Sequence, residues 1–176
     1  MALRQILTEP NKILREKSLP VEKVDKDLQK LMDDMLETMY AAPGIGLAAI
    51  QVGVPKRVIV IDIAHKDKEG QKDPMFFVNP EVIDKSKNNS TYEEGCLSVP
   101  GQFAEIDRPN ECHVKYLDYN GQKKELKVKG MLATCIQHEI DHLEGILFID
   151  YLSKLKKTMI IKKLSKRKKE IERIVV

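Results

Sequence analysis

The sequence predicts an α+β fold: a single domain over residues 1–176 in which antiparallel or mixed sheets pack around a central helix, with a further helix at the C-terminus. Three observations predict it. Apolar residues recur at helical spacing in separated segments, a β-hairpin pattern lies between them, and the composition is globular, with 42% hydrophobic and 32% charged residues. A chain of 176 residues is long enough to bury a substantial core in one domain.

The first half of the chain predicts one helix and two strands. The helix covers residues 25–40 and is stopped by Pro43 and the two glycines that follow it, Gly44 and Gly46, because proline and glycine are poor helix formers. Residues 57–62 predict a buried strand, a polar loop runs from His65 to Pro74, and residues 75–83 predict a strand interrupted at Pro80. The residues at helical spacing on the apolar face of the helix are Leu28, Leu31, Met32, Met35 and Met39.

The second half predicts a hairpin and two helices. The hairpin covers residues 112–128, with Asn120-Gly121 at the turn, a pair favoured where both turn residues need positive φ. Residues 131–143 predict a helix with Gly145 just past its end. A final amphipathic helix is predicted from residue 152 to about 171, and the face expected to pack on the body comprises Leu152, Leu155, Met159, Ile160 and Leu164.

Charge is unevenly distributed along the chain. Residues 154–176 contain ten Lys or Arg and two Glu, a net charge of +8, so the rest of the chain carries −5 of the overall +3. A basic segment on an acidic body is often associated with polyanionic partners. The N-terminus lacks the apolar stretch of a secretory signal, and no apolar run approaches the roughly 20 residues that cross a membrane. Three cysteines do not make a disulfide framework, so we expect a cytoplasmic protein.

The segment His138-Glu139-Ile140-Asp141-His142 has the pattern H-E-x-x-H inside the predicted helix 131–143. Because residues i and i+4 share one face of a helix, both imidazoles can reach the same ion. Glu139 is positioned to exchange protons with a water molecule at that ion without binding the ion itself. The alternative is a chance pattern in a charged helix, which is weakened because two of only four histidines fall here.

A catalytic divalent site usually has three protein ligands and one open position, so a third ligand is needed. A metzincin pattern would require histidine at residue 148, which is Phe148. A downstream glutamate would have to be Glu170 or Glu172, and both lie in a lysine-rich helix, which is an unfavourable environment for a metal ligand.

Cys96, in the segment Glu94-Gly95-Cys96-Leu97-Ser98, is the better candidate for the third ligand. A thiolate is a strong ligand for Fe(II), Zn(II) or Co(II), and the preceding glycine allows close approach of the backbone. The alternative is that Cys96 is a small buried apolar residue, which is what we expect of Cys112 and Cys135.

Three separated stretches complete the sequence pattern: Gly44-Ile45-Gly46-Leu47-Ala48-Ala49-Ile50-Gln51, Glu94-Gly95-Cys96-Leu97-Ser98 and Gln137-His138-Glu139-Ile140-Asp141-His142-Leu143-Glu144-Gly145. In this order and spacing they resemble the three signature motifs of the peptide deformylase family, in its bacterial type 1 form. The resemblance extends over nearly the whole chain. G-x-G-x-A-A alone would mean little, but the triple match is highly specific.

The resemblance implies a metal-dependent amide hydrolase that removes the N-formyl group from the N-terminal formylmethionine of newly made bacterial proteins and releases formate. One divalent ion, natively Fe(II) and in purified protein also Zn, Ni or Co, would be bound by Cys96, His138 and His142. Glu139 would be general base and then general acid, while the Gln51 amide and the Leu97 backbone N–H would face the formyl oxygen. Residues implied to bind the substrate are Ile45, Gly46, Glu94, Gly95, Thr134 and Cys135.

The sequence departs from the family pattern at Gly101-Gln102, where an acidic residue is expected before the glutamine, and Phe103 can widen or narrow the peptide groove. Asp141 and Arg108 either pair behind the ligands or are solvated surface charges. N-formylmethionyl nascent peptides are the expected partners. The basic segment 154–176 suits ribosome docking through phosphate contacts, with a merely solvated helix as the alternative.

Two other functions fit parts of the sequence. An endopeptidase would use the same H-E-x-x-H helix, but Phe148 stands where its third histidine is expected. A basic ribosome- or RNA-binding module with an inactive metal site would use the C-terminal segment. No zinc-finger spacing or aromatic-rich RNA-binding pattern is present, so sequence-specific nucleic-acid binding is not expected, and neither is a membrane span.

Overall fold

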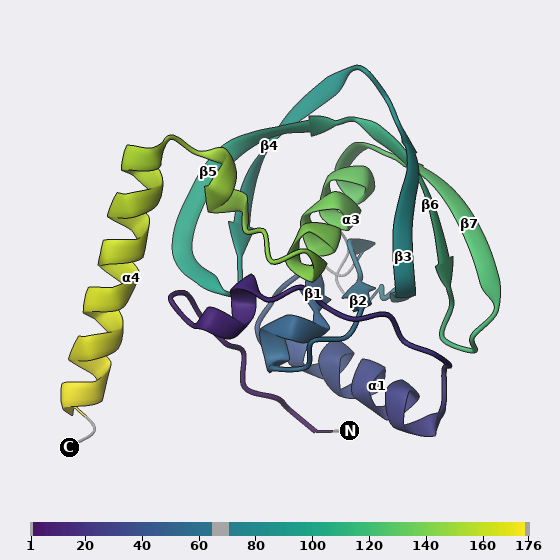
Figure 1. The fold of residues 1–176 in the computed structure, drawn as a ribbon, viewed down its shortest axis with the longest axis horizontal. Helices are drawn as coiled ribbons and strands as arrows, with labels where there is room; N and C mark the ends of the chain where they lie inside the picture. Colours follow the sequence, from purple (N-terminus) through teal and green to yellow (C-terminus); the bar gives the residue numbers. More distant parts are fainter. Residues whose placement is uncertain (1, 65–70, 175–176) are drawn as a thin grey trace.

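Two β-sheets hold the helix α3 between them, and the helices α1 and α4 lie outside this arrangement (Figure 1). The computed structural model describes residues 2–64 and 71–174, so residues 65–70 of the predicted polar loop lie outside the described residues. In chain order the described elements are η1 (Lys12–Arg15), α1 (Lys26–Ala41), β1 (Gly46–Ala48), η2 (Ala49–Val52), β2 (Val58–Ile61), β3 (Met75–Lys85), β4 (Asn89–Cys96), β5 (Val99–Pro109), β6 (Glu111–Leu117), β7 (Lys123–Lys129), α3 (Gly130–Leu143), η3 (Phe148–Tyr151) and α4 (Lys154–Ile174).

The larger sheet has five strands in the order β1-β2-β3-β6-β7, and each neighbouring pair is antiparallel. The smaller sheet is the antiparallel hairpin β4-β5, which curves along the other side of α3 (Figure 1). The predicted α+β class, with antiparallel sheets around a central helix, is therefore confirmed. The β4-β5 hairpin, which carries Cys96, was not among the predicted elements.

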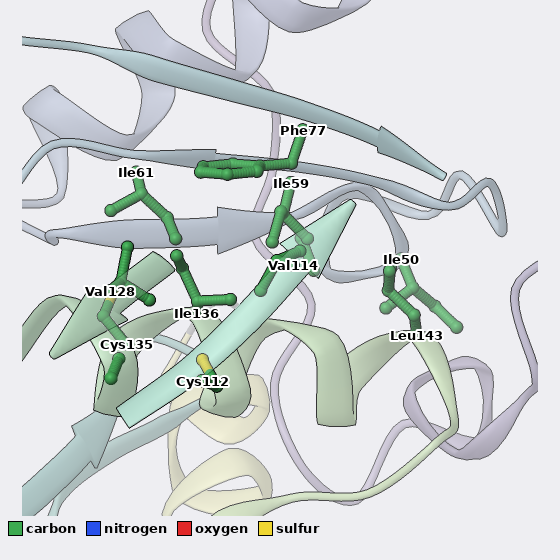
Figure 2. Packing of buried hydrophobic residues seen from close by; sticks show 12 residues of the cluster. Ile50, Ile59, Ile61, Phe77, Cys112, Val114, Val128, Cys135, Ile136 and Leu143 are labelled. Carbon is green, nitrogen blue, oxygen red and sulfur yellow. The ribbon is translucent and has the colours of Figure 1, made fainter. Parts of the chain in front are cut away.

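Strand β2 shows why helices cover both faces of the larger sheet. Successive side chains of a strand point to opposite faces, and all four residues of β2 are buried, so both faces of the sheet are covered here. Val58 and Val60 pack with the methionine-rich face of α1, while Ile59 and Ile61 pack towards α3. In Figure 2, Ile136 of α3 points towards Ile61. Cys112 and Cys135 lie in this same core cluster and are buried, as expected.

The predicted helices correspond closely to α1 and α3. The Asp25 carboxylate caps α1 by accepting a hydrogen bond from the backbone N–H of Leu28 at 2.9 Å. Helix α3 starts one residue earlier than predicted and ends at Leu143. Gly145 has φ 74°, the left-handed conformation expected after the helix, and a Cβ there would overlap the backbone carbonyl of Arg15.

The hairpin turn differs from the prediction. Strands β6 and β7 pair as expected, but the turn spans residues 118–122, and only Gly121 within it has positive φ, at 80°. The Asp118 carboxylate accepts hydrogen bonds from the backbone N–H groups of Asn120 and Gln122, each at 2.9 Å. Because an Asp side chain can stabilise a turn in this way, a longer loop replaces the two-residue turn that Asn-Gly predicted. The interruption predicted at Pro80 is a change of register in β3, beside Asn79 with φ 51°.

Helix α4 packs on the body through part of the predicted face, since three of the five predicted residues contact the body and two do not. Leu164 is buried, and Leu152, Ile160 and Ile161 are half-buried against η3 and β5. Leu155 and Met159 were predicted to face the body, but they are 71% and 50% exposed, because the contacting stripe runs through residues 157, 160, 161 and 164. In Figure 1, α4 is the outermost element on the side of β5. No helix among the described residues is long and apolar enough to cross a membrane.

Candidate metal centre

Three side chains from two parts of the fold converge beside α3. His138 and His142 lie one turn apart on α3, and Cys96 is the last residue of β4, where the hairpin turns so that Cys96 pairs with Val99. Their ligand atoms all lie within 4.8 Å of one another, and Cys96 Sγ is 3.3 Å from His142 Nε2. Tetrahedral coordination at about 2.1 Å for nitrogen and 2.3 Å for sulfur places donors about 3.6 Å apart. The donor set therefore fits one divalent transition-metal ion.

A buried ion pair supports His138. Its Nδ1 is 2.8 Å from Glu94 Oε1, and Arg108 donates two hydrogen bonds to the Glu94 carboxylate, at 2.7 and 3.0 Å. Although burial opposes ionisation, the bonds with His138 and Arg108 hold the pKa of Glu94 below its ordinary value. An imidazole whose Nδ1–H donates to a carboxylate presents Nε2 for coordination, so Glu94 fixes the orientation of this ring.

Arg108 extends the support to Asp141 and Tyr151. Arg108 Nη1 donates to Asp141 Oδ2 at 2.8 Å, and the Tyr151 hydroxyl donates to the same oxygen at 2.7 Å. Arg108 is only 4% exposed, and its guanidinium carbon lies 4.9 Å from the centre of the Tyr151 ring. Asp141 and Arg108 therefore pair behind the histidines and are not solvated surface charges.

The two histidines have different surroundings. Burial alone would lower the pKa of His138, but its hydrogen bonds with Cys96 and Glu94 outweigh burial and raise it well above the ordinary value. His142 is fully buried, and its Nδ1 has no hydrogen-bond partner in the part of the chain that the structure describes. Burial, together with the nearby His138 and Arg108, lowers the pKa of His142 well below its ordinary value. The His142 ring is therefore neutral, which is the form that binds metal ions.

Glu139 lies at the inner end of a cavity next to this cluster. It is 4% exposed, and its buried Oε2 has no hydrogen-bond partner within residues 2–64 and 71–174. Burial raises the pKa of Glu139 to about 7, His138 opposes the increase and the Glu94 charge adds to it. The glycine at position 46 allows this arrangement, because a Cβ at Gly46 would overlap the Glu139 carboxylate. A carboxylate with a pKa near neutrality can both take up and return a proton.

The Gln51 side chain is held in one orientation. Its Oε1 accepts a hydrogen bond from the backbone N–H of Ala48 at 2.9 Å, so its amide nitrogen faces the site. This nitrogen donates to Ser98 Oγ at 3.0 Å and lies 3.5 Å from Cys96 Sγ. Gln51 and Ser98 are both buried. The sequence reading did not assign Ser98 a role, although it lies two residues after the cysteine.

The cavity has a volume of about 620 Å³ and reaches the surface beside β4, β5 and the start of α3. All the residues predicted to bind the substrate line it, and so do Gln51, Leu97, Cys96, His138 and Glu139. Met131 also lines the cavity but was not among the predicted residues. It lies one helical turn before Thr134 and Cys135, so helical periodicity places it on the same face of α3. Other lining residues that the sequence reading did not assign are Pro43, Gly44, Ile63, Tyr92, Glu93, Val99 and Pro100.

Comparisons with known proteins identify one family. The family model described as polypeptide deformylase matches residues 3–158. Peptide deformylase of Pelagibacter ubique is 68% identical over the whole of both chains, and that of Maricaulis maris is 59% identical over 98% of each. The crystal structure of peptide deformylase from Ehrlichia chaffeensis has a TM-score of 0.91 and 44% identity, and the match covers 96% of this chain and 98% of that one.

A second crystal structure of the Ehrlichia chaffeensis enzyme, in complex with actinonin, has a TM-score of 0.90 and 48% identity, with 95% of this chain and 98% of that one covered. Both the family match and the identity of the relatives extend far beyond half of the chain. The cluster of one cysteine and two histidines fits the metal dependence of that family. The chain therefore belongs to the polypeptide deformylases, the metal-dependent hydrolases that remove the N-formyl group from nascent peptides.

Proposed function

We propose that the cavity beside α3 is the deformylation site, with Cys96, His138 and His142 as the metal ligands. The observation that carries the proposal is the convergence of these three donors next to the carboxylate of Glu139, whose Oε2 has no hydrogen-bond partner among the described residues. When bound there, a divalent ion supplies Lewis-acid chemistry that activates water towards an amide carbonyl. Thiolate and imidazole donors suit Fe(II), and we propose Fe(II) as the native ion, with Zn, Ni or Co able to replace it.

Glu139 is the proposed general base and then general acid. Its buried carboxylate takes the proton from water as the water attacks the formyl carbon. It then returns that proton to the amine nitrogen as the carbon–nitrogen bond breaks and formate leaves. A pKa near 7 suits both halves of this cycle, because the group neither holds nor loses its proton too strongly.

Gln51 and the Leu97 backbone N–H are the proposed donors to the formyl oxygen. The bond from the Ala48 N–H to Gln51 Oε1 supports this role, because it turns the amide N–H groups towards the cavity before the substrate binds. A donor that is already oriented in this way is worth about 3 kcal/mol to a developing oxyanion. Ser98 is a positioning residue in this proposal, since its hydroxyl oxygen accepts from Gln51 Nε2.

The methionine side chain is proposed to enter the apolar part of the cavity, bordered by Ile45, Gly46, Gly95, Thr134 and Cys135. Thr134 and Cys135 are 5% and 7% exposed, so this region is shielded from water. Glu94 lines the same wall, while its carboxylate oxygens bind Arg108 and His138. A shielded apolar slot favours methionine over polar side chains at the first position of the peptide.

The test is formate release from formyl-Met-Ala-Ser by protein purified without oxygen, with metal content measured on the same sample. We expect Fe(II) in the protein and turnover of this peptide. Glu139→Ala is expected to lose at least about a hundredfold in kcat while it retains its metal. The matched control is Glu144→Gln, because Glu144 follows α3 and binds Arg57 and Lys17 away from the cavity. Full turnover by Glu139→Ala would reject the assignment of Glu139, and loss of metal would make it a ligand.

We further propose that residues 1–176 form one catalytic domain in the bacterial cytoplasm and that α4 docks it on the ribosome. Lysines 162, 163, 166, 168 and 169 of α4 are exposed, and so is Arg167. Leu155 and Met159 add exposed apolar area beside this basic surface. Ribosomal RNA is a polyanion, and phosphate contacts of this kind weaken as salt rises.

The docking test keeps α4 folded. Truncation near residue 160 would remove Leu164, which packs on the body, so substitution is the better perturbation. The triple variant Lys162→Gln, Lys166→Gln, Lys169→Gln is expected to weaken ribosome co-sedimentation and reduce its salt dependence. The control makes the same three changes at Lys123, Lys127 and Lys129, which are exposed on β7. Equal binding by both triple variants would reject docking through α4.

A further inference from the structure

The chain that precedes α1 is bonded through its backbone to the two proposed donors to the formyl oxygen. The Leu7 N–H donates to the carbonyl of Gln51 at 2.7 Å, and the Glu9 N–H donates to the carbonyl of Ser98 at 2.8 Å. Leu7 and Glu9 are two residues apart, the spacing at which the N–H groups of an extended chain point the same way. One short stretch of backbone therefore holds the main chain of Gln51 and of the residue that follows Leu97.

The same segment is also bonded to the end of α3. The Ser18 N–H donates to the carbonyl of Leu143, the last residue of α3, at 2.8 Å. Close by, the backbone of Arg15 lies so near Gly145 that a Cβ at Gly145 would overlap the Arg15 carbonyl. Residues 7–18, which we call the N-terminal strap, therefore contact each of the three motif stretches.

The three carbonyl groups that the strap binds lie where their own elements end or turn. Gln51 is near the end of η2, Ser98 is in the turn between β4 and β5, and Leu143 ends α3. The last residues of a helix leave their carbonyl groups without a partner inside that helix, and buried backbone groups are nearly always paired. All three residues are buried, so the strap supplies hydrogen bonds in a region that water barely reaches.

The strap has anchors of its own, apart from these bonds. Leu14 is fully buried, and Arg15 forms ion pairs with Asp150 at 2.6 Å and with Glu9 at 3.3 Å. None of residues 7–18, all of which the structure describes, lines the cavity. The strap can therefore affect the reaction only through the residues that it holds, and loss of a single N–H leaves its other anchors in place.

The positions of the two donors matter because a donor stabilises an oxyanion best when it is oriented before the reaction. A misplacement of about 1 Å can cost about a hundredfold in rate. The Ala48 N–H orients the side chain of Gln51, whereas the Leu7 N–H holds its main chain. Both restraints are needed to fix one amide group in space, because the side chain can only be as well placed as the backbone that carries it.

We propose that the N-terminal strap is a positioning element for deformylation, in which the backbone N–H groups of Leu7 and Glu9 fix the spacing of the two donors to the formyl oxygen. The inference rests on the proposed function, because it uses the roles proposed there for Gln51 and Leu97. The strap does not touch the substrate. Its effect is therefore on kcat, with little effect on KM.

The experiment removes single N–H groups from the strap region and measures kcat and KM for formyl-Met-Ala-Ser. Leu7→Pro lacks the N–H that binds Gln51, and we expect it to lower kcat about tenfold while KM stays within about twofold. Leu7→Ala keeps that N–H and is expected to stay close to the wild type. Ile6→Pro is the matched control, because the Ile6 N–H has no hydrogen-bond partner within residues 2–64 and 71–174, and it is expected to turn over at the wild-type rate.

Two further measurements separate positioning from a general loss of structure. In a Gln51→Ala background, Leu7→Pro is expected to lower kcat by less than about threefold, since the donor that Leu7 positions is already absent. The Co(II)-loaded Leu7→Pro protein is expected to show the wild-type absorption spectrum, because the lost bond ends at Gln51 and not at a proposed metal ligand.

Wild-type kcat in Leu7→Pro would overturn the inference. An equal loss in Ile6→Pro would also overturn it, and so would the same fold-loss with and without the Gln51 side chain, or an altered Co(II) spectrum. If Leu7→Pro does not fold, incorporation of the α-hydroxy acid analogue of leucine at position 7 removes only the N–H and carries the same expectations. Absence of formate with the wild-type protein would instead reject the proposed function, so the two failures are distinguishable.

Discussion

Replacement of the Arg108 guanidinium by an apolar group tests the buried network behind His138. In Arg108→Met the apolar stem still covers Tyr151, but the Glu94 carboxylate loses the two bonds at 2.7 and 3.0 Å, and Asp141 loses the one at 2.8 Å. Glu94 is 6% exposed, so water does not replace the lost partner. Removal of one member of a buried ion pair typically costs 3–5 kcal/mol, and we expect about 3 kcal/mol here, since His138 remains as a partner.

The double variant separates the worth of the pair from the cost of an unpaired charge. Glu94→Gln keeps an oxygen that accepts from His138 Nδ1–H but carries no charge. Arg108→Met in the Glu94→Gln background is therefore expected to cost at least about 1 kcal/mol less than in the wild type. Urea unfolding of the four proteins at equal metal saturation measures the free energies. A loss below about 1 kcal/mol in Arg108→Met, or an additive cycle, would refute this account of the network.

Three further predictions concern the pocket, the base and the N-terminal segment. Cys135→Trp is expected to fill the methionine slot and cripple turnover without loss of metal, whereas Cys135→Ala stays active; normal kinetics of the tryptophan variant would remove Cys135 from the slot. Gly46→Ala is expected to displace the Glu139 carboxylate and lower kcat by about a hundredfold at unchanged metal content, and wild-type kcat would contradict the close contact. Burial opposes ionisation of Asp34, but hydrogen bonds from the Ala2 N–H, Lys30 and Arg4 lower its pKa from 3.8 to about 2. The contribution of the Asp34 carboxylate to the free energy of unfolding is therefore complete above about pH 4 and lost as the pH falls towards 2. Asp34→Asn is expected to make the free energy of unfolding depend less on pH over that range, and an unchanged pH dependence would refute this linkage.

The sequence predicted the parts of the site that depend on local periodicity. The spacing of His138 and His142 on a helix fixes their common face, whatever surrounds that helix. Cys96 was harder to assign, because a lone cysteine in a loop-like segment has no periodic signal. The chemistry of a thiolate, the preceding glycine and the motif resemblance favoured it over an ordinary buried thiol. Its position depends on the β4-β5 hairpin, which is a tertiary arrangement.

The β4-β5 hairpin escaped prediction because its residues lack the usual strand pattern. Residues 89–96 read Asn-Ser-Thr-Tyr-Glu-Glu-Gly-Cys, and four of them are exposed or half-buried polar residues. One face of this two-stranded sheet meets solvent, so its apolar content is low. Part of the packing face of α4 was misjudged for a related reason. Leu155 and Ile160 are equally apolar, and only the position of β5 and η3 decides which of them is covered.

The proposed ligand cluster joins Cys96, at the end of β4, to His138 of α3, which lies 42 residues further along the chain. An ion held there closes that long loop in the way a crosslink does, because the unfolded chain cannot bring the three donors together without losing entropy. Metal affinity and thermal stability are then coupled. Once the free ion concentration exceeds its dissociation constant, each further tenfold increase raises the free energy of unfolding by about 1.4 kcal/mol. Oxidation of the Cys96 sulfur would thus lower the stability of the fold as well as abolish hydrolysis.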